Sequence, residues 1–186
     1  MIASARLAGW VAEKHDGQLI KRTDEPYFNH VLAVADKAGQ AVQYGYEIGL
    51  CHDLLEDTAT TGTELLQMLR SLDYSEEAAT LITSCVVELT DVFTAQAYPD
   101  LAKAVRKNRE FIRLGTISAT AQTVKYADLI YNLHWVLLYD QKHAFKYLLK
   151  KQQLLGELKL GDPQLREEAF TVIRQALINL GVLQKT

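Results

Sequence analysis

The sequence predicts a single all-α domain, and three observations support this fold class. The chain has 186 residues, a length typical of one domain. Apolar residues recur at helical spacing along most of the chain, whereas no alternating strand pattern or internal repeat persists. Hydrophobic residues make up 48% of the chain and are interspersed with charges, which excludes a disordered or fibrous protein. We therefore expect one helical bundle over residues 1–186.

Caps and apolar spacing predict the helices of the first half of the chain. Pro26 opens the second helix, because its fixed backbone angle suits a first helical turn. Thr61 and Glu64 have capping-box spacing, and Ser75 precedes two acidic residues that favour a helix start. The expected helices cover residues 2–14, 27–37, 47–55, 64–72 and 76–89.

The second half of the chain is also predicted to be helical. Pro99-Asp100 starts a basic helix that runs through Arg113, and Asp162-Pro163 precedes a final helix closed by Gly181. The motifs described below lie within about residues 4–140. Residues 141–183 are therefore expected to pack the bundle or to form a homodimer rather than to carry chemistry. The expected helices of this half cover residues 99–113, 118–139, 142–158 and 164–180.

Composition and charge exclude several classes of partner. A net charge of −3 provides no basic surface for nucleic acid or for an anionic membrane. No apolar run approaches the length of a membrane span, and residues 1–10 lack the features of a secretion signal. Cys51 and Cys85 lie in apolar helical patterns without metal-type spacing, as reduced core thiols do. We expect a cytoplasmic protein that binds neither nucleic acid nor membrane.

One imidazole and three carboxylates lie close together at His52, Asp53, Glu56 and Asp57. In a continuous helix, Glu56 would lie one turn after His52 on the same face, and Asp57 would lie one turn after Asp53. Such a group is costly to bury unless a divalent cation turns the carboxylates into ligands or into acid–base groups beside a ligand. The alternative is a solvated acidic helix end, but apolar residues before and within the group argue against full solvation.

Further candidate ligands come from distant predicted helices. His30 lies among apolar residues, where it is either a ligand or a buried core histidine. Asp128 lies in an apolar helix and needs a partner, which is either a metal or Lys125 one turn earlier. Asn132 lies one turn further along the same face. Two imidazoles and two carboxylates would suit Mn²⁺, Fe²⁺ or Zn²⁺, with positions left for water.

The order of these motifs along the chain resembles the metal site of the HD superfamily. More narrowly, the chain resembles the small stand-alone alarmone hydrolases of the RelA/SpoT group. The matching segments run in family order from about residue 4 to 135, which is most of the chain. They are AEKHDGQ (12–18), EPYFNH (25–30), HDLLEDT (52–58), LTD (89–91) and VKYADLIYNL (124–133).

The resemblance implies an HD-domain helical bundle that holds one Mn²⁺, with Zn²⁺ or Fe²⁺ as alternatives. It also implies that Glu56 and Asp57 form the catalytic pair, with the division of labour between them left open. The implied reaction removes the pyrophosphate from the 3′ position of guanosine tetra- or pentaphosphate, (p)ppGpp, and yields GDP or GTP. The metal ligands implied by the resemblance are His30, His52, Asp53 and Asp128.

Several substrate contacts also follow from the resemblance. Asn132 would contact the nucleotide, and Lys103 of the basic helix would neutralise its phosphates. The alternative for Lys103 is a solvated basic face. The family usually has a purine-binding cation where this chain has Ile20, so Lys21 or Arg22 would supply the cation that stacks on the base.

Two other functions are compatible with the same residues. The departure at Ile20 favours a different nucleotide in the same site, either (p)ppApp or NADPH with its 2′-phosphate. The other hypothesis is a non-catalytic regulator that binds a nucleotide on a retired hydrolase fold. This hypothesis predicts a lost ligand or a lost Glu56-Asp57 pair, and neither is lost.

Overall fold

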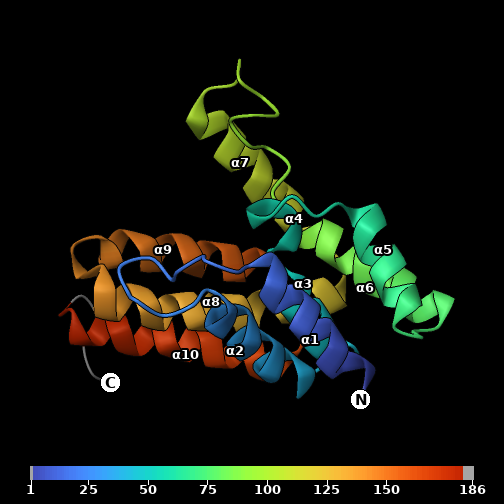
Figure 1. The fold of residues 1–186 in the computed structure, drawn as a ribbon. Coiled ribbons are helices and arrows are strands. Elements are labelled where there is room, and N and C mark those ends of the chain that lie inside the picture. The colour runs from blue at the N-terminus through green and yellow to red at the C-terminus, as the bar shows by residue number, and fades with distance from the viewer. Residues whose placement is uncertain (1, 182–186) are drawn as a thin grey trace.

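The computed structural model describes residues 2–181, which form a helical bundle (Figure 1). Within this range the structure has no named strand, and one isolated backbone bridge joins Leu19 to Pro26. The predicted all-α class is therefore confirmed for the described part of the chain. The helices are α1 (Ala3–Lys14), α2 (Phe28–Gly39), α3 (Gly45–Cys51), α4 (Leu54–Asp57), α5 (Gly62–Ser71), α6 (Glu76–Leu89), α7 (Lys103–Leu114), α8 (Ala119–Tyr139), α9 (Gln141–Glu157) and α10 (Pro163–Asn179).

Helix α8 is the centre of the bundle. It packs against α2, α3, α6, α9 and α10, which are drawn from both halves of the chain. Tyr126, Leu129 and Leu133 on this helix are fully buried, as expected for a helix with neighbours on most sides. A polar side chain on α8 must therefore meet a partner or line a cleft, and this condition applies to Asp128.

Side-chain caps set the starts of several helices, as the sequence predicts. The Thr61 hydroxyl accepts a hydrogen bond from the Glu64 backbone N–H at 3.2 Å, and the Ser75 hydroxyl accepts one from Ala78 at the same distance. Asp162 accepts a bond from the Leu165 N–H at 2.8 Å. These bonds satisfy N–H groups that lack a partner in the first helical turn.

The continuous helix predicted over residues 47–55 is wrong. Helix α3 ends at Cys51, and α4 begins at Leu54 after a break at His52 and Asp53. Asp53 leaves regular helical geometry, with φ of −102° and ψ of 0°. The break lets the side chains of neighbouring His52 and Asp53 meet, whereas a continuous helix would separate them. The expected one-turn spacing of Asp53 and Asp57 is kept, since the Asp57 backbone N–H donates to the Asp53 carbonyl at 2.9 Å.

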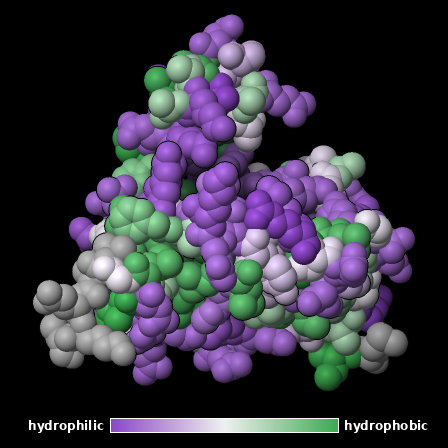
Figure 2. Space-filling view, turned by 90° about the vertical axis from the view of Figure 1, so that its left-hand side faces the viewer, coloured by the Kyte–Doolittle hydropathy of each residue, from purple (hydrophilic) through white to green (hydrophobic). Residues whose placement is uncertain are grey.

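Helix α7 and the loop before it extend away from the bundle as an arm (Figure 1). The basic helix starts at Lys103 rather than at the predicted Pro99, because residues 99 and 100 form a turn and Ala102, with ψ of 143°, is not helical. Figure 2 shows hydrophilic side chains over most of the displayed face, with smaller separate hydrophobic areas. No described helix has both the length and the apolarity to cross a membrane.

The C-terminal helices α9 and α10 pack against α8 and against each other. Packing of the bundle by these helices was expected from the sequence. The predicted packing segment extends to residue 183, and its last two residues lie outside the described range. The division of the chain into one domain, with a motif-bearing core and a packing segment, stays a prediction.

The contact between α2 and α3 depends on Gly49, and Gly49→Ala is expected to destabilise the protein. A Cβ at this position would lie 2.6 Å from the Ala35 Cα and 2.8 Å from the Ala35 N, so backbone would have to move. We expect the free energy of unfolding to fall by about 2–3 kcal/mol. Urea unfolding measures the change.

The matched control is Gly9→Ala in α1, where an added Cβ has no neighbour within 4 Å. Alanine in a helix interior should stabilise the protein by about 0.5–1 kcal/mol. Equal effects of the two substitutions would contradict a close α2–α3 contact at Gly49.

Candidate metal centre and catalytic cleft

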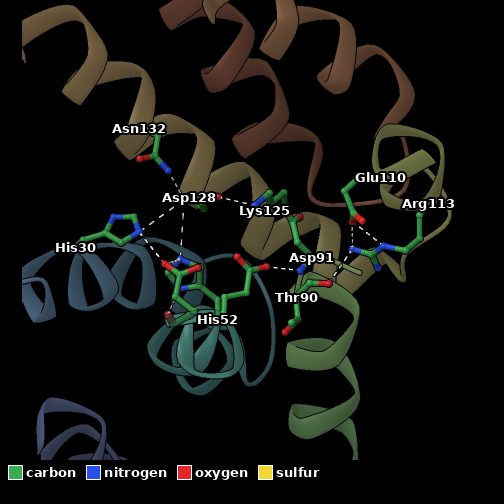
Figure 3. A network of polar contacts seen from close by, with 12 residues as sticks. His30, His52, Thr90, Asp91, Glu110, Arg113, Lys125, Asp128 and Asn132 are labelled. Atoms are coloured by element: carbon green, nitrogen blue, oxygen red, sulfur yellow. Dashed lines mark hydrogen bonds and ion pairs between the residues drawn. The ribbon is translucent and has the colours of Figure 1, made fainter. Parts of the chain in front are cut away.

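Side chains from three parts of the chain converge on one point (Figure 3). The ligand atoms of His30 on α2 and of His52 and Asp53 at the α3–α4 break all lie within 4.8 Å of one another. Asp128 on α8 completes the group, since its Oδ1 lies 3.7 Å from His30 Nε2 and 3.9 Å from His52 Nε2. The structure thus brings together all four residues that the sequence singles out as candidate ligands.

Hydrogen bonding at His52 leaves one ring nitrogen available to a ligand. Its Nδ1 lies 2.7 Å from the carbonyl oxygen of Gly49, so Nδ1 carries the hydrogen and donates it. Nε2 is buried and has no hydrogen-bond partner, although Asp53 Oδ2 is only 2.9 Å away. A metal-ligating histidine has this arrangement, with the outer nitrogen bonded to a carbonyl and the inner nitrogen free.

The charges of the cluster are strongly interdependent. Burial alone would raise the pKa of Asp53, but His52 and His30 hold it well below its usual range. Burial would lower the pKa of His52, but Asp53 and Asp128 raise it to about 9. The carboxylates therefore retain a proton on the imidazole, and a divalent cation would compete with that proton for the same place.

These features fit a divalent metal ion. The donor set of two imidazole nitrogens and two carboxylate oxygens is one that Mn²⁺, Fe²⁺ and Zn²⁺ accept. The buried Nε2 of His52 supplies a second reason, because it lies within 4 Å of both carboxylates and a cation between these groups would bind all of them. Tyr27 adds outer support, since its hydroxyl donates to Asp53 Oδ2 at 2.6 Å.

Lys125 and Asn132 flank Asp128 on α8. The Lys125 ammonium lies 2.8 Å from Asp128 Oδ2, and the Asn132 amide donates a hydrogen bond to Oδ1. Asp128 therefore forms the ion pair with Lys125 and also lies beside the histidines of the candidate metal centre, so one contact does not exclude the other. Burial would lower the pKa of Lys125, but Asp128 raises it, so Lys125 stays charged.

Lys125→Met is expected to destabilise the metal-free protein by about 3 kcal/mol, because it leaves a buried carboxylate without its ion-pair partner. The loss should be smaller with saturating Mn²⁺, because the ion supplies positive charge to the same carboxylate. Urea unfolding with and without Mn²⁺ measures both values. Lys146→Met on the exposed side of α9 is the control. An equal loss in both states would show that Lys125 acts independently of the metal centre.

Glu56 and Asp57 lie on α4 beside the cluster. A Glu56 carboxylate oxygen accepts a hydrogen bond from the Asp91 backbone N–H. Burial is the largest influence on Glu56 and raises its pKa to about 7, although part of the residue surface is exposed. Burial and the charge of Asp53 raise the pKa of Asp57 as well. Glu56 is therefore suited to exchange protons near neutral pH, and Asp57 holds a proton more tightly than a free carboxyl does.

The sequence analysis did not identify the residues that hold Asp91 in this position. Glu110 on α7 accepts hydrogen bonds from the backbone N–H groups of Val92 and Phe93, both at 3.0 Å. Arg113 forms an ion pair with Glu110 and donates to the Thr90 carbonyl at 3.1 Å. An acidic residue in a basic helix could have pointed to this contact, because a buried glutamate such as Glu110 needs hydrogen-bond donors or a cation as partners.

The cluster opens into a cleft of about 350 Å³. Lys21 and Asn132, two of the predicted substrate-binding residues, line this cleft. Two lysines that the sequence analysis did not assign to substrate binding, Lys125 and Lys151, also line it. The other lining residues are Ile20, Tyr27, His30, Asp53, Glu56, Asp57, Asp128, Tyr131 and Trp135.

The other predicted substrate-binding residues, Arg22 and Lys103, do not line the cleft. Arg22 donates to the Tyr139 carbonyl and forms a 3.0 Å ion pair with Asp140, which ties the loop before α2 to the end of α8. Lys103 is exposed at the first residue of α7. Neither position could be read from local sequence. Arg22 is held away by contacts with the end of α8, and Lys103 lies on the arm that projects from the bundle.

Comparison with solved structures identifies the fold. A metazoan ortholog of SpoT, described as hydrolysing ppGpp and acting in starvation responses, superimposes with a TM-score of 0.77. The match covers 98% of each chain at 21% sequence identity. The chain has an HD-domain fold. No protein-family model matches the sequence, and no curated protein matches it. The HD-domain fold is thus recognised from its three-dimensional arrangement, together with the His30, His52-Asp53 and Asp128 cluster within it.

Proposed function

We propose that the protein is a metal-dependent hydrolase that removes the 3′-pyrophosphate of (p)ppGpp and releases GDP or GTP with pyrophosphate. The observation that carries the proposal is a cleft lined by three candidate metal ligands, with His52 buried beside them, together with Glu56 and Asp57. Similarity to the fold of a ppGpp-hydrolysing protein over 98% of the chain supports the choice of substrate.

In this proposal the metal is Mn²⁺, with Zn²⁺ or Fe²⁺ as alternatives. When bound, such an ion makes water more acidic and polarises a phosphoryl oxygen. The Gly49 carbonyl orients the imidazole of His52, and the Tyr27 hydroxyl orients the carboxylate of Asp53. The residues that would hold the metal are His30, His52, Asp53 and Asp128.

The proposed proton transfers involve the two acids on α4. The attacking water forms a bond to the phosphorus nearest the ribose and loses a proton, and the bond from that phosphorus to the 3′ oxygen breaks. Glu56, with a pKa near 7, accepts the proton from the water. Asp57 delivers a proton to the departing 3′ oxygen, which becomes the 3′ hydroxyl of GDP or GTP.

The nucleoside would lie at the end of the cleft formed by Lys21, Asn132 and Trp135. The Trp135 indole donates to the Lys21 carbonyl at 3.0 Å, which holds the loop of Lys21 against α8. Lys21 supplies the cation for the base, and Asn132 supplies polar contacts to the nucleotide. Lys103 keeps a role in phosphate binding only if the arm moves toward the cleft.

A second candidate function uses the same centre on a different nucleotide. Ile20 is 6% exposed and lines the cleft where the resembling family usually has a cation. An apolar side chain at this position favours a base contact without a charged partner, which is compatible with (p)ppApp or NADPH. A homodimer through the C-terminal helices stays a prediction.

A nucleotide panel tests the proposed function. Purified protein with a measured content of Mn²⁺ should release pyrophosphate from ppGpp and from pppGpp. The same assay includes ppApp, and phosphate release from NADPH is measured in parallel. Faster turnover of either adenine nucleotide would favour the second candidate, and nucleotide binding without turnover in metal-replete protein would favour a regulator.

A further inference from the structure

Lys151 is a cleft residue in the helices that the sequence predicted to pack the bundle or to form a homodimer. Helices α8 and α9 are joined at Asp140 and pack side by side in opposite directions. Lys151 lies as far after Asp140 as Leu129 lies before it, so the pair of helices places Lys151 level with Asp128. Its side chain lines the same cleft as Lys125 and three of the candidate metal ligands, His30, Asp53 and Asp128.

The two cleft lysines differ in how their charge is balanced. Lys125 forms an ion pair with Asp128 at 2.8 Å. Among residues 2–181, no carboxylate lies within ion-pair distance of the Lys151 ammonium, which instead lies 5.2 Å from the Tyr147 ring centroid. Burial is the main cause that lowers the pKa of Lys151 to about 8, and the charge of Lys125 adds to it. An anion bound in the cleft would favour the charged form of Lys151 and so oppose the effects of burial and of Lys125.

Charges from other helices also reach Lys151. Asp128 and Asp91 raise its pKa, whereas Lys107 on α7 lowers it together with Lys125. Lys125 of α8 and Lys151 of α9 therefore place two positive charges at this end of the cleft, and only Lys125 is paired with a carboxylate. This arrangement is typical of a site for a multiply charged anion.

Successive turns of α8 give the cleft a direction. Lys125, Asp128, Asn132 and Trp135 line it in order along the helix, over about 15 Å. The base-binding residues of the proposed function lie at the Trp135 end, and the candidate metal centre lies beside Asp128. A 3′-pyrophosphate whose first phosphorus is at the centre therefore extends its second phosphate away from the base, toward Lys125 and Lys151.

We propose that Lys151 binds the terminal phosphate of the pyrophosphate group that is removed and holds the released pyrophosphate in the cleft. This inference rests on the proposed function for its choice of ligand. It assigns to α9 a substrate-binding role rather than a purely structural one. An ammonium bound to a phosphate oxygen is a charge-assisted contact, and Lys151 can form it without giving up a protein ion pair.

Calorimetric titration with inorganic pyrophosphate tests the proposal without nucleotide turnover. Protein and titrant contain the same concentration of free Mn²⁺, and the variants are Lys151→Met, Lys151→Arg and Lys150→Met. The dissociation constant for pyrophosphate should rise on the order of tenfold to a hundredfold in Lys151→Met. It should rise less in Lys151→Arg, which keeps the charge, and should not change in Lys150→Met, where the neighbouring lysine is exposed.

The outcomes separate this inference from the proposed function. Unchanged pyrophosphate affinity in Lys151→Met, or no binding by the wild-type protein, would overturn the role of Lys151 even if ppGpp is hydrolysed. Conversely, pyrophosphate binding that depends on Lys151 would support the anion site even if ppGpp is not a substrate. Thermal unfolding identifies misfolding, and a drop in stability of Lys151→Met with unchanged affinity would indicate a structural role and overturn the proposal.

Discussion

Asp53→Asn is expected to lower the affinity for Mn²⁺ by at least about 100-fold and to reduce hydrolysis to background. The substitution keeps the shape of the side chain but removes the negative charge that lies 2.9 Å from His52 Nε2 and 3.4 Å from His30 Nε2. It also places an amide where the Tyr27 hydroxyl donates at 2.6 Å. Metal content after dialysis and the increase in melting temperature on adding Mn²⁺ measure the effect independently of activity.

The matched control for this substitution is Asp24→Asn, in the exposed loop before α2. This variant should bind Mn²⁺ and hydrolyse nucleotide as the wild type does. Circular dichroism of both variants should retain the helical spectrum. If Asp53→Asn keeps wild-type Mn²⁺ affinity, the metal does not bind at the cluster.

Glu56→Gln is expected to lower kcat by about 10²–10⁴-fold, because glutamine cannot accept a proton from water. Glutamine preserves a carbonyl oxygen that can accept the hydrogen bond from the Asp91 N–H, so the loop should keep its place. Mn²⁺ affinity and KM should change little, since Glu56 is not among the candidate ligands. Steady-state kinetics and metal titration test these expectations together.

The matched control for Glu56→Gln is Glu77→Gln, on the exposed first turn of α6. It removes the same charge away from the cleft and should leave kcat unchanged. A large loss of Mn²⁺ affinity in Glu56→Gln, with kcat restored by excess metal, would instead make Glu56 a metal-binding residue.

The pH dependence follows from the pKa of Glu56. Burial raises this pKa from 4.5 to about 7. Because the proposed role requires the carboxylate form, kcat/KM should increase as the pH rises through about 7 and then level off. The rising limb should be absent from the residual activity of Glu56→Gln, and an unchanged pH profile would assign the titration to another group.

Glu56 also makes the stability of the fold depend on pH, and this dependence runs opposite to that of kcat/KM. Glu56 binds its proton more tightly in the folded state than in the unfolded state, so its contribution is complete below pH 4.5 and is lost as the pH rises through about 7. The proton therefore stabilises the fold while it blocks the proposed catalysis. Urea unfolding of wild type and Glu56→Gln across this range separates the contribution from those of other groups.

Local signals predicted most of the helices. The caps at Thr61 and Ser75 form as expected, and the long apolar pattern beginning at Ser118 corresponds to α8. Caps and periodicity act between residues that are close in sequence, so the sequence contains the necessary information. The break at Asp53 was not predicted, because it accompanies contacts with Tyr27 and His30, which lie far away in the chain.

The chemical types of the site were also evident from the sequence. Histidine and carboxylate residues in otherwise apolar helices are costly to bury alone, which made them candidate ligands, and the resemblance to the HD superfamily implied that His30, His52-Asp53 and Asp128 share one metal. The structure brings these side chains together, with Glu56 beside them. The metal itself and the roles of these residues stay predictions for the experiments above.

Only the tertiary structure decided which cations face the cleft. Lys21, Lys125 and Lys151 line it, whereas Arg22 is held by the end of α8 and Lys103 lies on the arm. Lysine and arginine are abundant on helix surfaces, so sequence position alone does not distinguish a substrate-binding cation from a solvated one. The distinction depends on how α8 and α9 are aligned and on where α7 projects, and these are properties of packing between distant segments.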